Sequence, residues 1–385
     1  MTESAVRVGG VYDPVAAELY PPTTIIVRDG RIVRIDSDGP ADLPVEDFSH
    51  AVAMPGLIDA HTHLSIATPG NEREQVVRPV EERVLRALRY ADAMLAEGVT
   101  SIRILGEPAW FDIRLRDAFA TGLFPGPRIF AAGRIVAPSH ANVSVVDAPA
   151  DGAGVVERVR QNLVQRVDWI KVYATPSSLL GDPTEAYYSR DEIRLIVETA
   201  NRAGVPVAAH AHGGNAVDDL IEAGVDTIEH GRYLEEQQLE MMAARGTVLC
   251  STVGIGVFSD VARSGCSVGE ALERSAQSVA QALAAGVRIV PGTDAVHGRL
   301  RFELEALEHY GASRADALRA ATVTAAEVVA RGHDLGRLEV GCLADFALLE
   351  GSPIDAERLP AVCATCVGGR VVWRAGERTR EELVV

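Results

Sequence analysis

The sequence is poor in aromatic residues and cysteine, and it has fewer basic than acidic residues. Only 5% of the 385 residues are aromatic, whereas 47% are hydrophobic, a composition typical of a soluble α/β protein rich in Ala, Val and Leu. The hydrophobic content excludes a disordered chain. With 37 basic against 54 acidic residues the net charge is −17, which disfavours nucleic acid or an anionic membrane as a partner.

Long apolar runs are also missing from the start of the chain. Residues Met1–Val8 contain no such stretch, so we expect neither a signal peptide nor a membrane span. The cysteines number five, an odd count that without a secretory leader fits a reducing cytoplasm. The one C-x-x-C pattern, Cys363 to Cys366, lies in an apolar run that predicts a strand rather than a metal site.

Short apolar runs alternate with amphipathic segments from Pro55 onward, the pattern of successive βα units. Eight strands are predicted, starting near Leu57, Thr100, Arg128, Trp169, Val205, Asp226, Thr247 and Arg288. Helices are predicted over Val80–Glu97, Trp110–Thr121, Val155–Arg166, Arg190–Ala203, Asn215–Ala223, Glu235–Ala244, Val268–Ala285 and Arg301–Ala330. We therefore expect an α/β fold with a (β/α)8 barrel of TIM type.

The two ends of the chain differ from the middle. Thr24–Val27 and Arg31–Ile35 flank an Asp-Gly pair, which predicts a hairpin. Similar short strands are indicated at Ala344–Leu349 and Gly368–Trp373. We expect a small β-sandwich domain formed by residues 1–54 and 344–385, with the barrel over residues 55–343.

Metal-ligating residue types follow the predicted strands, where the carboxyl ends of barrel strands ring one pocket. His61 and His63 are two residues apart on one strand, so both can face the same cation. His210, His230 and Asp294 each end another apolar run. Together these residues predict a metal centre.

Lys171 lies in the apolar run Asp168–Tyr173, where an unpaired cation would be costly. A neutral lysine amine can take up CO2 to give a carbamate, an anionic ligand able to bridge two divalent cations roughly 3.5–4 Å apart. The position of Lys171 therefore favours a two-metal hydrolase.

Several motifs in this order carry a resemblance to a known family: Pro55–His63, Ile170-Lys171, Ala209–Gly213, Ile228–Gly231 and Gly292–Ala295. The chain resembles the amidohydrolase superfamily, in particular the imidazolonepropionase-like branch that includes carbamate-containing dipeptidases and N-acyl amino acid hydrolases. The resemblance implies two divalent cations, for which imidazole and carboxylate-like oxygen ligands favour zinc. The implied ligands are His61, His63 and Asp294 for one cation, His210 and His230 for the other, and carbamylated Lys171 between them.

The same resemblance implies hydrolysis of a linear amide in a dipeptide, an N-acyl amino acid or a C-terminal peptide bond. A metal-bridging hydroxide is the expected nucleophile, because bound cations lower the pKa of water from 15.7 towards roughly 7. Asp294 is expected to act as general base and then general acid. A closed homo-oligomer is also expected.

Residues near the ligands are candidates for contact with substrate. His140, His212 and Tyr173 are predicted as catalytic residues, although each would serve equally well by bracing the site. Arg232 and Tyr233 lie just past His230, after Gly231, and are predicted to bind a substrate carboxylate, for which arginine has the matching fork. The competing interpretation of that pair is a solvated loop.

Two other functions stay open. In a mononuclear enzyme that hydrolyses a cyclic amide or deaminates a heterocycle, Lys171 would extend its amine towards water or pair with a carboxylate such as Glu229. A non-catalytic scaffold is the third interpretation, against which the presence of all six candidate ligands argues.

Overall fold

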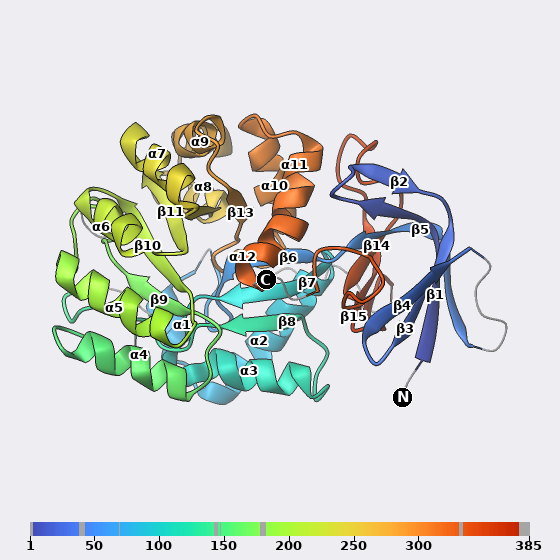
Figure 1. The fold of residues 1–385 in the computed structure, drawn as a ribbon, viewed down its shortest axis with the longest axis horizontal. Helices are drawn as coiled ribbons and strands as arrows, with labels where there is room; N and C mark the ends of the chain where they lie inside the picture. Colours follow the sequence, from blue (N-terminus) through green and yellow to red (C-terminus); the bar gives the residue numbers. More distant parts are fainter. Residues whose placement is uncertain are drawn as a thin grey trace.

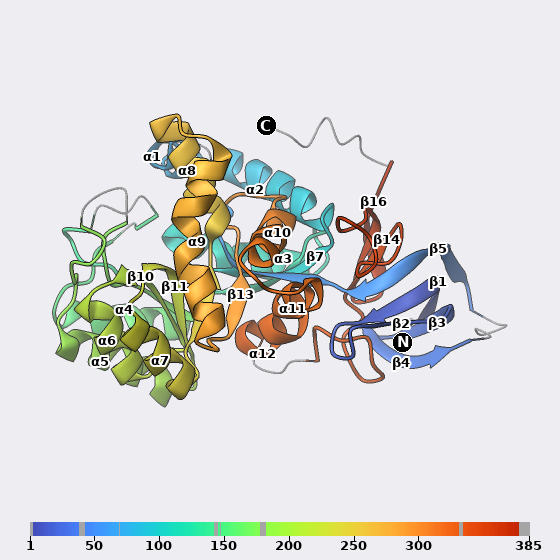
Figure 2. The ribbon, with the colours of Figure 1, turned by 90° about the horizontal axis from the view of Figure 1, so that it is seen from above.

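The computed structural model describes residues 3–37, 43–68, 70–141, 145–146, 148–177, 182–330 and 334–376, and the fold is α/β with a separate all-β part (Figure 1). The first and last strands of the chain pair in one sheet of order β16-β15-β14-β5-β1-β3-β4, with β2 against β1. The N-terminal and C-terminal strands therefore lie side by side, as both views show (Figures 1 and 2). Their bounds are Glu3–Asp13 (β1), Glu18–Tyr20 (β2), Thr23–Arg28 (β3), Arg31–Asp36 (β4), Val45–Pro55 (β5), Phe346–Leu349 (β14), Val362–Val367 (β15) and Arg370–Arg374 (β16).

The hairpin predicted from the Asp-Gly pair is confirmed, since β3 and β4 are antiparallel neighbours. Asp29 and Gly30 adopt φ values of 50° and 81° in the connecting turn, a left-handed conformation that these two residue types tolerate best. The strand predicted around the C-x-x-C pattern is β15. Both of its cysteines are buried free thiols in the core of this sheet.

The middle of the chain forms parallel strands in two groups, β6-β7-β8 and β13-β12-β11-β10-β9. Their bounds are Leu57–Thr62 (β6), Val99–Ile104 (β7), Arg128–Ala131 (β8), Ile170–Tyr173 (β9), Val207–Gly213 (β10), Thr227–Tyr233 (β11), Val248–Ser251 (β12) and Ile289–Pro291 (β13). All eight predicted strands are present. The largest displacement of a start is from Val205 to Val207.

Backbone hydrogen bonds join the two groups at both edges. Next to β8, the Val136 N–H donates to the Lys171 carbonyl at 2.8 Å, and the Tyr173 N–H donates to the Val136 carbonyl at 2.9 Å. Between β13 and β6, the Asp294 N–H donates to the His61 carbonyl at 2.7 Å. The hydrogen bond between Asp294 and His61 links the backbones of two candidate metal ligands.

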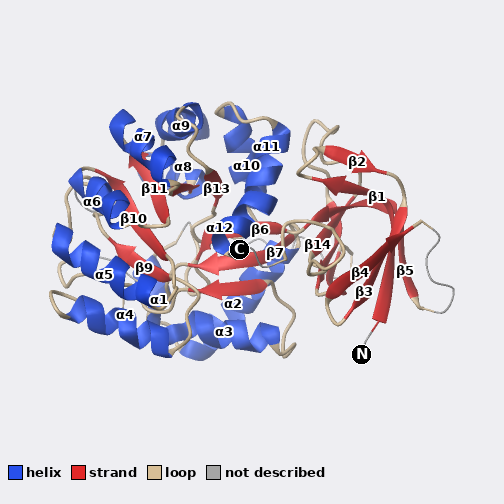
Figure 3. Cartoon of the chain, in the orientation of Figure 1, coloured by secondary structure: helices blue, strands red, loops and turns tan. Residues whose placement is uncertain are grey.

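Helices cover the outside of these strands (Figure 3). Their bounds are Glu72–Val76 (α1), Val80–Leu95 (α2), Phe111–Ala120 (α3), Gly154–Val164 (α4), Arg190–Arg202 (α5), Asn215–Ala223 (α6), Glu236–Arg245 (α7), Val253–Ser264 (α8), Val268–Ala284 (α9), Leu300–His309 (α10), Arg314–Arg319 (α11) and Ala325–Val329 (α12). A 3-10 turn, Pro108–Trp110, precedes α3, and a π-helix, Ala320–Thr324, lies between α11 and α12. No helix in the described part of the chain is long and apolar enough to span a membrane.

Two helices near the predicted site, α1 and α8, were not predicted. The α8 segment begins Val253-Gly254-Ile255-Gly256, and the side chain of its N-cap residue, Thr252, makes no capping hydrogen bond. Its first amides are satisfied instead by a distant residue, because the buried carboxylate of Glu303 accepts from the Val253 N–H at 3.0 Å and the Gly254 N–H at 2.6 Å. A cap supplied from α10 leaves no local signal in the α8 sequence.

The terminal sheet is fixed to the parallel strands by a buried carboxylate. Asp345, with a side chain 1% exposed, accepts from the Arg128 Nε at 3.0 Å and Nη2 at 3.2 Å, and from the Gly368 N–H at 2.7 Å. Arg128 opens β8, whereas Gly368 lies between β15 and β16. This carboxylate therefore joins three segments that are distant in sequence.

We expect Asp345→Ala to lower the free energy of unfolding by about 2–4 kcal/mol, because it leaves the Arg128 guanidinium and the Gly368 amide without their acceptor. Urea-induced unfolding, followed by circular dichroism, measures the effect. Arg194→Ala is the matched control, since it removes an exposed ion pair to Glu198 on α5 and is expected to cause no measurable change. Equal losses in both variants would contradict the role given to Asp345.

Candidate metal centre

The histidines predicted as ligands converge at the carboxyl ends of the parallel strands. The rings of His61 and His63 have centroids 5.6 Å apart, those of His61 and His230 5.1 Å, and those of His210 and His230 4.4 Å. The side chains of His61, His63 and His230 are at most 7% exposed, and His210 is buried. Strands that are far apart in sequence thus bring four imidazoles to one place.

Asp294 faces this group from the end of β13. Its Oδ1 lies 3.4 Å from His61 Nε2 and 3.5 Å from His63 Nε2, and its Oδ2 lies 3.9 Å from His230 Nδ1. Asp294 has φ 47° and His230 has φ 73°, a left-handed backbone that residues other than glycine adopt rarely. Such a conformation is retained where the surrounding structure enforces it, as in functional sites.

These atoms fit a cation. One ligand atom each from His61, His230 and Asp294 lies within 4.8 Å of the others. Among the described residues, Lys171 Nζ and His210 Nε2 are buried without a hydrogen-bond partner, a costly state for polar groups unless something binds them. The donor set, imidazole nitrogen with carboxylate oxygen, is one that zinc prefers.

Burial sets the charge of the candidate ligands. It lowers the pKa of His63 to about 4 and that of His210 well below its ordinary value. Burial also lowers the pKa of Lys171 to about 8, although the nearby carboxylates of Glu229 and Asp294 oppose the change. His63 and His210 are therefore neutral at pH 7, which is the form that binds metal, and a pKa of about 8 leaves a minor fraction of Lys171 as the free amine at that pH.

A second set of groups orients the imidazoles. His63 Nδ1 lies 2.8 Å from the Gly106 carbonyl, and His230 Nδ1 lies 2.6 Å from Thr252 Oγ1. His61 Nδ1 lies 2.8 Å from Oε2 of Glu229. Fixing one ring nitrogen in this way leaves the other free to face a cation.

Glu229 belongs to a fully buried network. Arg103 donates from Nη2 to Glu229 Oε1 at 2.9 Å and from Nε to the Ala60 carbonyl at 2.5 Å, and its guanidinium lies 4.3 Å from the Trp169 ring centre. Burial raises the pKa of Glu229, but Arg103 and His61 outweigh it and hold that pKa well below its ordinary value. The carboxylate is therefore anionic.

Tyr173 and His212 flank the ligands as predicted. The Tyr173 ring stacks on His210 with centroids 3.7 Å apart and planes at 14°. His212 follows His210 on β10, with ring centroids 4.8 Å apart, and its pKa is lowered to about 3 by burial and by the nearby Arg232. His140 is exposed and contacts the Tyr187 ring at 5.1 Å rather than the ligands.

Arg232 and Tyr233 point in different directions at the rim. The Arg232 guanidinium packs beside Gly256 of α8, because a methyl group added there would lie 2.1 Å from Nη2. Burial lowers the pKa of Arg232, and Asp260 on the same helix opposes that change. Tyr233 is 51% exposed, with its ring 6.3 Å from that of His212. Arg232 thus contacts α8, a helix that was not predicted.

The residues that support the ligand loops were also missed. Asp59 accepts from the Thr293 Oγ1 at 2.6 Å and the Thr293 N–H at 3.0 Å, which connects β6 to the loop after β13. Glu107 accepts from the Leu64 N–H at 2.6 Å and the Ser65 N–H at 3.0 Å. Asp59 and Thr293 adjoin the ligand motifs, so a search for polar neighbours of those motifs would have found them.

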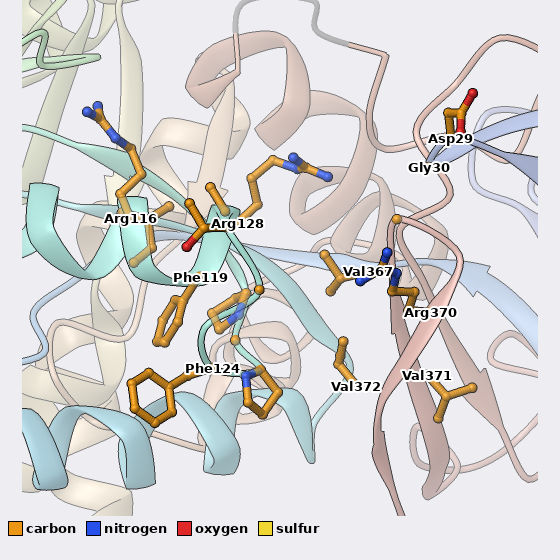
Figure 4. Close-up of a pocket in the computed structure, with 18 residues that line it drawn as sticks. Asp29, Gly30, Arg116, Phe119, Phe124, Arg128, Val367, Arg370, Val371 and Val372 are labelled. Atoms are coloured by element: carbon orange, nitrogen blue, oxygen red, sulfur yellow. The ribbon is translucent and has the colours of Figure 1, made fainter. Parts of the chain in front are cut away.

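A cavity of about 840 Å³ lies elsewhere, between the end of α3, the start of β8 and the β15–β16 hairpin. Phe119, Phe124, Val371 and Val372 line it together with Arg370 (Figure 4). None of the candidate metal ligands lines this cavity. Its position between the terminal sheet and the parallel strands separates it from the metal centre.

His297 braces the loop that carries Asp294. Its ring stacks on Tyr90 with centroids 4.2 Å apart, and its Nε2 lies 2.8 Å from the Ile66 carbonyl in the loop after His63. Burial lowers the pKa of His297 to about 4 from the ordinary 6.5. Between these two pH values the unfolded chain binds the proton and the folded chain does not, so this residue makes stability fall on acidification.

We expect His297→Gln, whose amide can still donate to the Ile66 carbonyl, to lose less stability than the parent between pH 7 and pH 4.5. The difference between the two proteins should be about 1–2 kcal/mol, measured by urea unfolding at both pH values with a chelator present. Because the candidate metal ligands are the same in both proteins, their contribution cancels. Parallel losses would show that His297 is protonated in the folded chain.

Known proteins resemble this chain over most of its length. It is 27% identical to an ochratoxinase of Aspergillus niger over 90% of this chain and 81% of that protein. It is 26% identical to an imidazolonepropionase of Methylobacterium nodulans over 84% and 86% of the two chains. The structure of a Xaa-Pro dipeptidase with bound methionine superposes with a TM-score of 0.86 at 25% identity, covering 97% of this chain and 100% of that one. The sequence profile of the Amidohydrolase family matches residues 52–372, and the chain belongs to that family.

Proposed function

We propose that this protein is a metal-dependent hydrolase of linear C–N amide bonds, acting on a dipeptide, an N-acyl amino acid or a C-terminal peptide bond. The observation that carries the proposal is the convergence of four buried histidines and Asp294 beside Lys171, whose Nζ has no hydrogen-bond partner among the described residues. Membership of the Amidohydrolase family supports the same reaction class.

The fold proposed for this enzyme is a (β/α)8 barrel of TIM type over residues 55–343, with a small β-domain from residues 1–54 and 344–385. The hydrogen bonds at both edges of the parallel strands support closure of the barrel. The pairing of β1–β5 with β14–β16 supports the composite β-domain. Residues 1–2, 38–42 and 377–385 of that proposed domain lie outside the described residues.

The residues present fit two zinc ions. His61, His63 and Asp294 would hold one, His210 and His230 the other, and Lys171 as its carbamate would be shared. When bound, the cations supply Lewis acidity that makes water a nucleophile at neutral pH. The neutral state of the histidines and the free amine of Lys171 are the forms that this arrangement requires.

Asp294 is the proposed proton carrier. Its side chain is 18% exposed, more than those of the neighbouring histidine ligands, so one carboxylate oxygen can reach both the attacking water and a substrate. Asp294 would accept the proton of the water and then deliver it to the nitrogen of the leaving amine. Tyr173, stacked on His210, and His212, beside it on β10, would orient the scissile carbonyl, with His140 further out beside Tyr187.

The substrate class rests on the relatives and on the charges at the rim. One solved relative is named as a Xaa-Pro dipeptidase, which favours a dipeptide with a free carboxylate. Arg232 and Tyr233 are the proposed partners of such a carboxylate, because they follow His230 at the mouth of the site. In this role Arg232 would bind substrate while packed against α8, so the position of α8 would set how far the guanidinium reaches.

A mononuclear cyclic-amide hydrolase or deaminase is the second candidate. The similarity to an imidazolonepropionase favours it. In such an enzyme Lys171 would keep its amine and face the anionic Glu229 and Asp294. The two candidates therefore differ in the state of one side chain and in the number of cations bound.

We expect Lys171→Ala to lose about one zinc ion per chain relative to the parent, because the shared ligand is removed while the histidines remain. Inductively coupled plasma mass spectrometry of both proteins, purified in bicarbonate-containing buffer, gives the metal content. His297→Gln serves as control, since it changes a buried polar residue outside the proposed ligand set. An unchanged content of one zinc ion in Lys171→Ala and in the parent would favour the mononuclear candidate.

The proposed reaction is tested by supplying the zinc-loaded protein with dipeptides, N-acyl amino acids, short peptides and cyclic amides, and measuring products by mass spectrometry. We expect release of an amine and a carboxylic acid from one linear class. Asp294→Asn provides the background and is expected to be at least about a hundred-fold slower, the usual cost of removing a general acid–base group. Turnover restricted to cyclic amides or amino-heterocycles would refute the linear-amide proposal.

A further inference from the structure

His61 differs from the other candidate ligands in the group that faces its second ring nitrogen. His63 meets a carbonyl and His230 a hydroxyl, and both are neutral groups. His210 is hydrogen-bonded to the backbone of Pro176, again a neutral partner. Of these four, His61 has the nearest carboxylate at Nδ1, with Glu229 Oε2 at 2.8 Å, whereas Asp294 Oδ2 lies 3.9 Å from His230 Nδ1.

We propose that Glu229 is a positioning residue for the metal centre, which fixes His61 as the tautomer with the proton on Nδ1 and thereby presents Nε2 to the cation. The inference rests on the metal site of the proposed function and is independent of the amide substrate. Glu229 Oε2 lies 2.8 Å from His61 Nδ1, a separation at which the negative charge of the carboxylate favours a proton on that nitrogen, and Nε2 faces Asp294 at 3.4 Å.

Glu229 is too deeply placed for a direct role with substrate. Its side chain is 0% exposed, and Oε1 accepts from Arg103 Nη2 at 2.9 Å and from the Thr227 hydroxyl. Oε2 is the one oxygen left for His61. A carboxylate with one oxygen bonded to Arg103 and Thr227 and the other buried against His61 acts through His61 and not on a reacting molecule.

Arg103 makes the carboxylate rigid and keeps it charged. The guanidinium is held at Nε by the Ala60 carbonyl at 2.5 Å, at Nη1 by Thr227 Oγ1 at 3.1 Å, and on its face by Trp169. Ala60 lies on β6, Arg103 on β7, and Thr227 and Glu229 on β11, while Trp169 directly precedes β9. The position of Glu229 is therefore set by the strands and not by a loop.

The competing explanation for the closeness of Glu229 and His61 is a different cation site, formed by His61, Glu229 and Cys250. The ligand atoms of these three residues also lie within 4.8 Å of one another. The adjacent Arg103 guanidinium argues against it, since a dication there would lie beside a fixed positive charge in a medium of low dielectric constant. Burial also raises the pKa of the Cys250 thiol well above its ordinary value, which opposes the thiolate that metal binding needs.

An anionic partner at one ring nitrogen makes an imidazole a stronger metal ligand through the other. The effect of Glu229 should therefore fall only on the zinc ion that His61 holds. Loss of such a partner costs roughly 10–100-fold in metal affinity. We expect Glu229→Gln to weaken by that factor the zinc ion held by His61, His63 and Asp294, and to change the other zinc affinity less than three-fold. Competition titration of the purified protein against a chromophoric zinc chelator measures both. The zinc affinity that also falls in His61→Asn is the affinity of the ion held by His61.

Cys250→Ser is the matched control, since it alters the third member of the same buried cluster and is expected to leave both zinc affinities unchanged. Glu229→Asp keeps the negative charge for Arg103 but withdraws it from His61, so it should weaken the same zinc ion even if Glu229→Gln does not fold. Equal weakening of both zinc ions would indicate a general disturbance of the core and overturn the inference. A loss of zinc affinity caused by Cys250→Ser would instead support a cation held by His61, Glu229 and Cys250.

The tautomer itself is visible in the metal-free protein. Long-range 1H–15N correlation spectra of protein labelled in histidine should show Nδ1 of His61 protonated and Nε2 bare, with the signals assigned by their absence in His61→Asn. In Glu229→Gln we expect a shift towards the Nε2–H form. A wild-type signal with the proton on Nε2 would overturn the inference. Retention of these results in a protein that hydrolyses no amide would refute the proposed function alone.

Discussion

The ion pair between Arg103 and Glu229 lies in the dry interior of the parallel strands, and the arrangement of the metal centre depends on it. Both side chains are 0% exposed, and either charge alone would be strongly destabilising there. Arg103 and Thr227 therefore fix the position of the Glu229 carboxylate, and this carboxylate in turn contacts His61. The position of Glu229 also bears on the neighbouring strand. β10 and β11 pair with His210 opposite Glu229 and Ala211 opposite His230.

One physical cause, removal of water, sets most of the charge states at the site. It lowers the pKa values of the buried histidines and of Lys171, and it raises the pKa of Asp59 to about 7. Glu229 departs from this trend because Arg103 compensates its charge. Neutral imidazoles of His63, His210 and His230 therefore lie close to the anionic carboxylate of Glu229.

The periodic parts of the fold were predictable because local sequence dictates them. Eight apolar runs identify the strands, and the polar residues at their carboxyl ends predict the candidate ligands, which the parallel strands bring together. The α8 helix was not predictable in this way. Its glycine-rich start has no local cap, and Glu303 on α10 supplies the acceptors from fifty residues away in the chain. Arg103 was missed for a related reason, because an arginine inside a strand gives no indication of a partner on another strand.

For Lys171, the sequence predicts burial but not the chemical state of the amine. The apolar run around it indicates burial, and burial alone makes its amine a weaker base. Its Nζ nevertheless lies among ligands that are neutral or anionic, so the group could balance charge as a cation. Carbamylation would turn this one donor into an anionic acceptor and change its charge by two units at the point where the two pairs of histidines meet. That reversal suits two dications and is excessive for one, so the number of metals and the state of Lys171 are a single physical question.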